Sequence, residues 1–529
     1  MQYSSPAYFL LFLPFVLLLY KIVSKRVRPK ILLLASFLFI FLLSKSRIIF
    51  LILSILSIYF SALLLKRMKE KAIVELENVS KDQKKVWKKK EKRKERLVFI
   101  LCLLFNLGIL IVLKYSFFLG TNLNHLFTVL DFPFQFSVPK FILPIGISFY
   151  TLQALSYLID VYRDTICADK NIFRFSLFVS FFPIIMEGPI CRYSEIAYPL
   201  YQGEDLSYRN ITFGAQRILY GLMKKMVIAD RLNIIVKTIF DHYASYDGGI
   251  ILLGAILYTI QLYMDFSGVM DIVIGSGEMF GIRLPENFRQ PFFSKNISEF
   301  WMRWHITLGK WFKDYIFYPL SLSKGLKRLT MKLRKVLGNH FGPLVSGSIA
   351  LFCVWLCNGL WHGAAWTYIF FGMYHFCFIL FENVTEPFFS KVYRKLHVNK
   401  ESKIYLSLVI FKTWIIIIIG EMFFRATSLT AGFGMLEKIF TEFSLASFKH
   451  GFLYTLGLTK GDFIIVFLIL IIVFVISVLK EKKIDVREKI ANYPIPLRWT
   501  IYYVLILIII IFGAYGVGYA PVDPLYVNF

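Results

Sequence analysis

Charged residues are scarce in this sequence, and acidic residues are scarcer than basic ones. Asp, Glu, Lys and Arg make up 18% of the 529 residues, whereas hydrophobic residues make up 57% and the mean hydropathy is +0.62. A soluble chain of this length carries about 25% charged residues. The composition therefore excludes a soluble globular protein and a disordered chain, and it leaves a large polytopic membrane protein.

Cysteine and glycine are also few, with 6 and 31 residues respectively. These numbers exclude a disulfide-rich scaffold and a collagen-like chain. No two cysteine pairs have the spacing of a zinc site, and the sequence lacks a His-Glu-x-x-His helix, a Walker loop and a Gly-x-Ser-x-Gly elbow. We therefore expect no metal ion and no permanently bound cofactor.

The basic residues, which give a formal charge of +27, lie in short runs between apolar stretches. That placement is typical of cytoplasmic loops beside membrane lipid and disfavours nucleic acid as a partner. Residues 66–96 carry 14 Lys or Arg against six acids. We interpret them as a basic cytoplasmic loop that fixes the topology, although a site for an anionic lipid or an acidic partner is the alternative.

Long apolar segments predict an all-α, polytopic transmembrane helical bundle with about 11–13 spans plus re-entrant or interfacial helices. The first apolar segment, 6–22, precedes its positive charges, which is the reverse of a signal peptide, so we expect a retained span. Without a repeat or a soluble domain, the chain is predicted to be one transmembrane domain over 1–529, with C-terminal spans and a tail over 461–529. The other expected spans are 31–44, 48–65, 97–118, 140–160, 172–190, 211–229, 249–266, 344–360, 364–382, 404–424, 461–480 and 498–518.

The segment 282–343 mixes aromatic and charged residues at short range. Asn296 precedes an apolar-periodic run and offers a helix start. Aromatic and apolar residues then follow at helical spacing, namely Trp301, Trp304, Leu308 and Trp311. This pattern predicts an amphipathic interfacial helix or a re-entrant helix, and it carries His305.

His362 lies in the apolar segment CNGLWHGAAWTYIFFGMYH, among small residues that let helices or a ligand approach closely. A buried imidazole stays neutral and can accept a proton, which suits a general base. An ionisable residue within a span usually faces the bundle interior or a water-filled cavity. We therefore predict a catalytic role for His362, whereas His375, in the same run, is expected to be an ordinary core residue.

Several long motifs resemble the membrane-bound O-acyltransferase (MBOAT) family, in particular its bacterial branch that O-acetylates alginate or peptidoglycan. They include LPIGISFYTLQALSYLIDVYR at 143–163, LFVSFFPIIMEGPICRYSE at 177–195 and QLYMDFSGVMD at 261–271. The resemblance continues through 285–318, 358–375 and 423–428, and covers a family core of about 140–430.

The resemblance implies a ring of transmembrane helices in which a cytoplasmic funnel and an outer cavity meet near a histidine. His362 matches the near-invariant histidine of the family, and His305 matches the second histidine of the bacterial branch. Asp265 and Ser267 resemble a polar cluster of the family core, with helix pairing as the alternative role for Asp265. The remaining expected substrate-binding residues are Asn287, Arg289, Lys310, Asn358 and Trp361; interfacial solvation is the alternative for Asn287, Arg289 and Lys310.

The carboxy-terminal residues PLYVNF are similar to a terminal aromatic motif of bacterial polymer O-acylation systems, in which a tyrosine is an acyl relay. Here that tyrosine is Tyr526, and an interfacial aromatic anchor is the alternative.

The resemblance implies an O-acyltransferase of the bacterial cytoplasmic (inner) membrane. It would move an acetyl group from a cytoplasmic thioester, acetyl-CoA, across the membrane to a cell-surface polysaccharide or peptidoglycan. A secreted or periplasmic SGNH-type acetyltransferase is the expected partner. The alternatives are D-alanyl transfer to teichoic acid from a carrier protein and, in a different class, a transporter or flippase for a lipid-linked glycan.

Overall fold

The computed structural model describes residues 2–77, 80, 83–449 and 451–515, and no β-strand occurs among them. Within these ranges, seven helical segments are long and apolar enough to cross a membrane. The expected all-α polytopic membrane fold is thereby confirmed. The seven segments are Arg28–Glu77, Lys84–Val129, Gly248–Met279, Lys324–His362, Lys403–Arg425, Lys460–Glu481 and Ile495–Phe512.

The described residues form two compact units, and the helices α8 (Tyr208–Leu222) and α10 (Gly248–Met279) contribute residues to both. The expectation of a single domain stays a prediction. The first unit contains 1–214 and 276–285. Its other helices are α1 (Leu13–Ile22), α2 (Arg28–Ser44), α3 (Ile48–Glu77), α4 (Lys84–Val129), α5 (Ile147–Tyr162), α6 (Ile172–Ser180) and α7 (Tyr193–Gln202).

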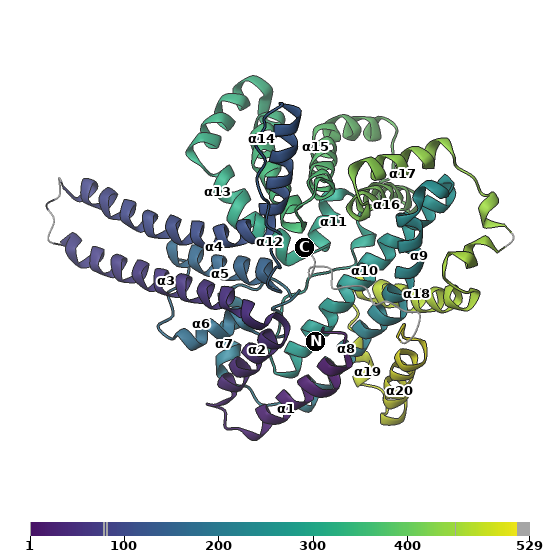
Figure 1. The fold of residues 1–529 in the computed structure, drawn as a ribbon, viewed down its shortest axis with the longest axis horizontal. Coiled ribbons are helices and arrows are strands. Elements are labelled where there is room, and N and C mark those ends of the chain that lie inside the picture. The colour runs from purple at the N-terminus through teal and green to yellow at the C-terminus, as the bar shows by residue number, and fades with distance from the viewer. Residues whose placement is uncertain (1, 78–79, 81–82, 450, 516–529) are drawn as a thin grey trace. The chain divides into compact units, whose positions relative to one another are not determined.

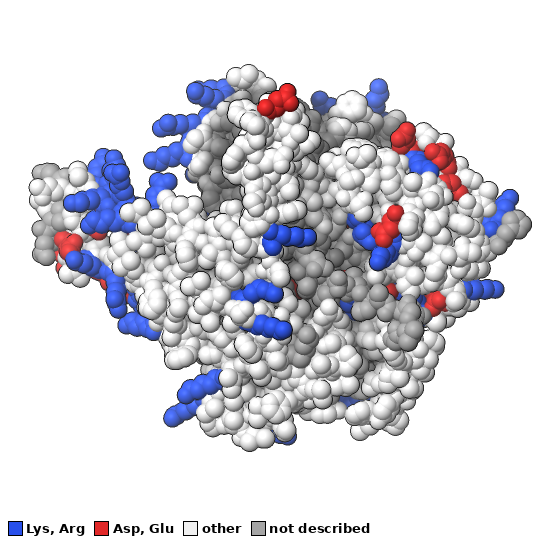
Figure 2. All heavy atoms as spheres, viewed as in Figure 1, with Lys and Arg blue, Asp and Glu red and all other residues white. Residues whose placement is uncertain are grey.

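The helices α3 and α4 run side by side as a hairpin (Figure 1). With 46 residues, α4 is about 69 Å long at 1.5 Å per residue, which exceeds the roughly 30 Å hydrocarbon core of a bilayer. Its basic first turns, which begin at Lys84, therefore extend beyond the apolar span. Lys and Arg side chains gather over this end of the hairpin (Figure 2). Most of the predicted loop 66–96 is thus helical.

Two predicted spans of the first unit are only partly helical. Helix α5 begins at Ile147, directly after Gly146, which adopts a left-handed conformation with φ of 76°. A Cβ atom at Gly146 would lie 2.0 Å from the backbone oxygen of Ile185, so only glycine fits there. Helix α6 ends at Ser180 because Pro183 disfavours helical backbone before it, and 181–190 continue as a buried non-helical segment.

The second unit contains the described residues of 215–275 and 286–523. The segment predicted to be interfacial or re-entrant forms two short helices, α11 (Ile297–Arg303) and α12 (Ile306–Phe312), followed by α13 (Tyr318–Ser321). This unit also contains the π-helix η3 (Met223–Ala229), α9 (Asp230–Asp241), α14 (Lys324–His362), α15 (Trp366–Lys395), α16 (Lys403–Arg425), α17 (Leu429–Thr441), α18 (Lys460–Glu481), α19 (Val486–Ala491) and α20 (Ile495–Phe512).

Candidate active site

His362 is the last residue of α14, and its side chain is buried, with 5% of the residue exposed. Gly363 follows in an extended conformation, and α15 starts at Trp366. Two glycines bring α14 and α15 close together here. A Cβ atom at Gly359 would lie 2.5 Å from the oxygen of Tyr368, and one at Gly372 would lie 2.4 Å from the oxygen of Trp355. The small residues around His362 thus allow close helix packing, as the sequence predicted.

His305 lies in the turn between α11 and α12 and is 3% exposed. Asn296 caps α11, because its side-chain oxygen accepts a hydrogen bond from the backbone N–H of Glu299 at 2.8 Å. This is the helix start predicted from the sequence. His305 itself has a left-handed backbone, with φ of 46° and ψ of 49°. That conformation is uncommon for a residue with a Cβ atom and is frequent at functional sites.

Asn287 holds the turn that carries His305. Its side-chain oxygen accepts hydrogen bonds from the backbone N–H and the hydroxyl of Thr307, both at 3.0 Å, and lies 3.4 Å from Nδ1 of His305. Its backbone oxygen accepts from the N–H of Ile306 at 3.0 Å. Because Asn287 is fully buried, these bonds fix the orientation of the imidazole against the start of α12.

The indole of Trp361 lies between the two histidines. Its ring centroid is 5.4 Å from that of His305 and 5.1 Å from that of His362, with edge-to-face geometry in both cases. Phe266 of α10 packs on His305 at 4.8 Å, and Phe424 of α16 packs on His362 at 5.1 Å. Aromatic residues from α10, α14 and α16 thus enclose the pair, and the structure brings His305 and His362 together.

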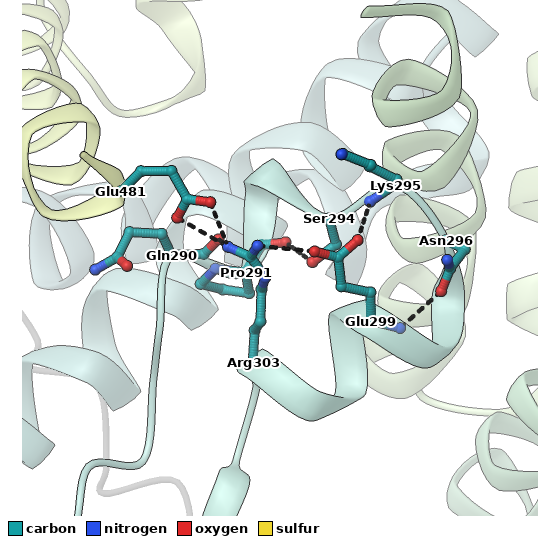
Figure 3. Close-up of polar contacts among 8 residues, drawn as sticks. All are labelled: Gln290, Pro291, Ser294, Lys295, Asn296, Glu299, Arg303 and Glu481. Atoms are coloured by element: carbon teal, nitrogen blue, oxygen red, sulfur yellow. Dashed lines mark hydrogen bonds and ion pairs between the residues drawn. The ribbon is translucent and has the colours of Figure 1, made fainter. Parts of the chain in front are cut away.

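A polar cluster supports α11 from the side of α18 (Figure 3). The guanidinium of Arg303 donates to both carboxylate oxygens of Glu481 at 3.0 and 2.9 Å and to Glu299 at 2.7 Å. Glu299 also accepts from the backbone N–H of Lys295 at 2.9 Å. The end of α18 is therefore tied to the helix that precedes His305.

Asp265 and Ser267 on α10 belong to a network of buried charges. Asp265 pairs with the ammonium of Lys225 at 2.7 Å, and Asp230 pairs with the same ammonium at 2.8 Å. Ser267 accepts a hydrogen bond from Lys224 at 2.9 Å. The ion pair of Asp265 with Lys225 is the kind of contact expected if Asp265 serves to pair helices, which was its alternative role. Its predicted role in substrate binding stays a prediction.

The network continues from Lys224 toward the segment that contains Asn287. Lys224 pairs with Asp271 at 2.6 Å, and Asp271 accepts from Nε of Arg217 at 2.9 Å. Arg217 also donates twice to the carboxylate of Glu286, at 2.7 and 2.6 Å. Such a chain is stable inside a protein only because each charge has opposite charges beside it.

Two cavities lie beside this network. The larger has a volume of about 620 Å³, and Arg289 lines it. The smaller, of about 40 Å³, shares several lining residues with the larger cavity and reaches Ser267 and Asn287. Arg289 and Asn287, which were both expected to bind substrate, therefore line cavities. Lys310, on α12, is exposed and lines neither of these two cavities.

Of the other residues singled out in the sequence, one lies close to His362 along α14, one lies outside the described residues and one lies in the core. Asn358 is buried on α14, one turn before His362. Tyr526 lies outside the described residues, so its acyl-relay role stays a prediction. His375 is fully buried among the rings of Trp301, Trp355, Phe371 and Tyr374, as expected for a core residue. Among the described residues, no group of three or more His, Cys, Asp or Glu side chains is placed to hold a metal ion.

Sequence reasoning missed Arg217, Lys224 and Asp271 as neighbours of the site. A signal was present, because Lys224 and Lys225 interrupt the apolar segment 211–229 and the acids Asp265 and Asp271 interrupt the segment that becomes α10. Opposite charges in two neighbouring apolar segments indicate pairing inside the bundle.

The chemistry available at the site follows from burial. Burial lowers the pKa of His305 to about 3, so its imidazole is neutral at physiological pH. A neutral imidazole can accept a proton or a hydrogen bond, and the surrounding aromatic rings leave little of it exposed. The site therefore suits proton transfer to or from a reacting hydroxyl and not the stabilisation of an anion by a permanent positive charge.

Comparison with known proteins identifies the class. The sequence profile of the membrane-bound O-acyltransferase family, MBOAT, matches residues 162–428, which include both histidines. The chain belongs to this family, and it is a multi-pass membrane O-acyltransferase.

Curated relatives extend the match beyond that segment. The chain is 32% identical over 481 residues to the probable alginate O-acetylase AlgI of Pseudomonas aeruginosa, a match covering 89% of this chain and 81% of the relative. It is 33% identical over 370 residues to the peptidoglycan O-acetyltransferase of Helicobacter pylori, covering 65% and 64%. It is 30% identical over 275 residues to the teichoic acid D-alanyltransferase of Bacillus subtilis, covering 50% and 65%.

Proposed function

We propose that this protein transfers an acetyl group from a cytoplasmic thioester, acetyl-CoA, across the membrane to a hydroxyl group of a cell-surface polysaccharide or peptidoglycan. The observation that carries the proposal is the pair of buried histidines joined by the indole of Trp361. The relatives that match the largest share of the chain support acetyl as the acyl group, since they are O-acetylating enzymes of alginate and peptidoglycan.

In the proposed reaction, His362 accepts the proton of the attacking hydroxyl group. At the same time, the hydroxyl oxygen forms a bond to the carbonyl carbon of the thioester. The carbon–sulfur bond breaks, and the proton returns to the thiolate, so that the products are an ester and a free thiol. His305, oriented by Asn287, assists by positioning the thioester or by passing the proton to the departing sulfur. Positioned proton transfer contributes roughly 10²–10⁴-fold to such a rate.

The accepting hydroxyl belongs to the glycan, to a partner protein or to Tyr526. We propose a secreted SGNH-type acetyltransferase as the partner that completes transfer to the glycan. The distance between a membrane-embedded site and a surface polymer supports a second protein that carries the acetyl group onward.

The test replaces His362 by Ala in the full-length chain and measures ester-linked acyl groups released from the cell surface by mass spectrometry. The ester content is expected to fall at least about 100-fold, because the general base is lost. His340→Ala is the matched control, since His340 is exposed on the same helix, and it should leave the esters unchanged.

The identity of the released group decides between the two acyl donors. Released acetate supports the proposal, whereas released D-alanine that disappears with His362→Ala would support the alanyl alternative. Surface esters that persist in a folded His362→Ala protein would contradict a catalytic role for this histidine.

A further inference from the structure

Gly338 interrupts α14 and divides it into a first arm, 324–337, and a second arm, 339–362. Its backbone, with φ of 78° and ψ of −177°, is not helical, and glycine adopts such a conformation readily. The hydroxyls of Thr330 and Ser346 lie 2.6 Å apart, although residues with a separation of 16 would be about 24 Å apart on a straight helix. A Cβ atom at Gly342 would lie 2.6 Å from Cα of Arg334. The first arm therefore folds back along the beginning of the second arm.

The charges of the first arm all have the same sign. No Asp or Glu occurs between Asp314 and Glu382, so the arm carries cations and no acid. All of these cations are exposed, and within the described part of the chain none has a carboxylate within 4 Å. Lys and Arg side chains project from this part of α14 (Figure 2). The cations are Lys324, Lys327, Arg328, Lys332, Arg334 and Lys335.

The first arm is amphipathic. Its partly buried side chains recur at helical spacing, and they lie on the face that packs against the second arm. They are Leu326, Leu329, Thr330 and Leu333. The opposite face, here called the basic face, consists of Lys324, Lys327, Arg328 and Lys335 around Met331, which is 61% exposed. The arm therefore presents four unpaired cations and one apolar side chain away from the protein.

The second arm places the basic face at the membrane boundary. Segment α14 is long and apolar enough to cross a membrane. Phe341, Val345 and Ile349 form a stripe along the start of the second arm and are 40%, 42% and 43% exposed, as expected for side chains that face lipid. Because the first arm lies beside these turns, its cations lie where the span enters the bilayer. Their positive charge indicates the cytoplasmic side.

Anionic lipid headgroups and an acidic protein are the two classes of partner that such a face could bind. Lysine is depleted from protein–protein interfaces, which disfavours the acidic protein. An exposed methionine among cations, next to a lipid-facing stripe, is typical of helices that lie at a membrane surface. A cluster of about four to eight cations on an amphipathic helix beside a span indicates binding of anionic lipid.

The basic end of the α3–α4 hairpin has a different arrangement, although it is also rich in lysine. Acids alternate with its cations, and several form ion pairs: Lys66 with Glu70, Lys71 with Glu75 and Lys94 with Glu91. Its exposed residues Lys85, Lys88 and Lys89 precede the apolar residue Leu97 by at least eight positions, which is about 12 Å along a helix. That distance exceeds the roughly 8 Å over which exposed charges interact at physiological ionic strength. Unpaired cations close to the bilayer therefore distinguish the first arm of α14.

We propose that the basic face of the first arm binds the headgroups of anionic phospholipids in the cytoplasmic leaflet and thereby anchors the segment that joins the two histidines. His305 directly precedes α12, which leads through α13 into α14, and His362 ends α14. An anchor on the first arm therefore restrains both ends of this segment. The lipid site stands on its own, whereas its coupling to acyl transfer rests on the proposed function.

The first experiment measures hydrogen exchange of the backbone amides of 324–337 by mass spectrometry, on the full-length protein in nanodiscs. Exchange should be about tenfold slower in phosphatidylglycerol than in phosphatidylcholine, because bound headgroups resist opening of the arm. The triple variant Lys327→Gln/Arg328→Gln/Lys335→Gln should lose this difference. Glutamine keeps the helix propensity and most of the side-chain length, so the fold should be retained.

The matched control, Lys85→Gln/Lys88→Gln/Lys89→Gln, removes the same charge from exposed positions of α4 and should keep the lipid-dependent protection. Equal exchange in the two lipids, or equal loss of protection in the two triple variants, would overturn the lipid site. Polyglutamate added to phosphatidylcholine nanodiscs tests the acidic protein. Protection by polyglutamate in the absence of any protection by phosphatidylglycerol would show that the face binds an acidic polypeptide, and the inference would be wrong.

The second experiment measures acyl transfer by the same proteins in the same two lipids. The wild type and the α4 control should be faster in phosphatidylglycerol, and the α14 triple variant should lose that advantage. Equal rates in the two lipids despite lipid-dependent protection would overturn the coupling and leave the lipid site standing. Surface esters that persist in His362→Ala would overturn the proposed function, and the exchange measurement would still decide the lipid site by itself.

Discussion

The charged residues around α10 and the histidines at the ends of α11 and α14 are buried to a similar degree, yet their surroundings differ. Lys225, which is 2% exposed, is bound by the carboxylates of Asp230 and Asp265. His305, which is 3% exposed, contacts the amide of Asn287 and the rings of Phe266 and Trp361, all of which are neutral.

The difference shows that two groups of buried residues in one unit are suited to different tasks, one to stability and the other to proton transfer. A buried ammonium between two carboxylates keeps its charge and holds its helices together, because losing either partner leaves an uncompensated charge. A buried imidazole among neutral groups stays uncharged and retains its capacity to accept a proton. We therefore expect substitutions in the charged network to reduce stability and substitutions among the histidines to reduce activity.

The largest effect is expected when the charged network is broken. Lys225→Met should reduce the free energy of unfolding by about 3–5 kcal/mol, because Asp230 and Asp265 would both lose the buried ammonium that pairs with them. Thermal unfolding of the purified protein in detergent measures the loss. Lys438→Met, which removes the partly exposed pair of Lys438 with Glu442, is the control and should cost no more than about 1 kcal/mol. A Lys225→Met protein as stable as this control would show that the network is not structural.

The next largest effect is expected at His305, where a substitution should reduce the rate of acyl transfer and leave the stability of the protein nearly unchanged. His305→Asn should lower transfer about 100-fold because the imidazole is lost. Its thermal unfolding should stay close to that of the wild type, because asparagine tolerates the left-handed backbone better than most residues. Acyl transfer and unfolding are measured on the same preparation. A loss of stability equal to that of Lys225→Met would erase the distinction between the two regions.

The pH dependence of stability sharpens the comparison. Because burial lowers the pKa of His305 to about 3 from an ordinary value of about 6.5, the unfolded chain binds a proton between these values that the folded chain does not. Stability from this residue is therefore full above pH 6.5 and is lost as the pH falls toward 3, with a slope of at most about 1.4 kcal/mol per pH unit. The difference between wild type and His305→Asn, followed by chemical unfolding over this range, should show that slope. Parallel curves for the two proteins would contradict it.

The smallest effect is expected at the partly exposed ion pair of Arg303 with Glu481. Glu481→Gln should cost about 0.2–1 kcal/mol, because partly exposed ion pairs contribute little and Arg303 keeps Glu299. The cost should shrink as salt is added, since screening weakens exposed pairs. Unfolding at low and at high ionic strength measures this. A cost above about 2 kcal/mol, independent of salt, would place this pair with the buried network.

Much of the fold and of the candidate site could be predicted from local signals. Long apolar segments predicted the polytopic helical fold, and Asn296 predicted the start of α11. The small residues around His362 predicted the close approach of α14 and α15. The juxtaposition of His305 and His362 came from the family resemblance, because no periodicity links residues that are 57 positions apart.

Other features depend on tertiary contacts and could not be predicted. The segment 181–190 is apolar enough for a span, but its prolines and its packing keep it non-helical. Asp265 had two alternatives, and only the position of Lys225 shows the ion pair. The larger cavity combines side chains of α8, α10, α18 and α20, which are distant in the sequence, so no local pattern indicates it.

At position 305 the left-handed backbone makes folding favour a different residue from the one that the proposed catalytic role requires. Glycine adopts that conformation without strain, so a saturation library at position 305 sorted by expression in the membrane should enrich glycine and asparagine. The same library sorted by surface esters should enrich histidine.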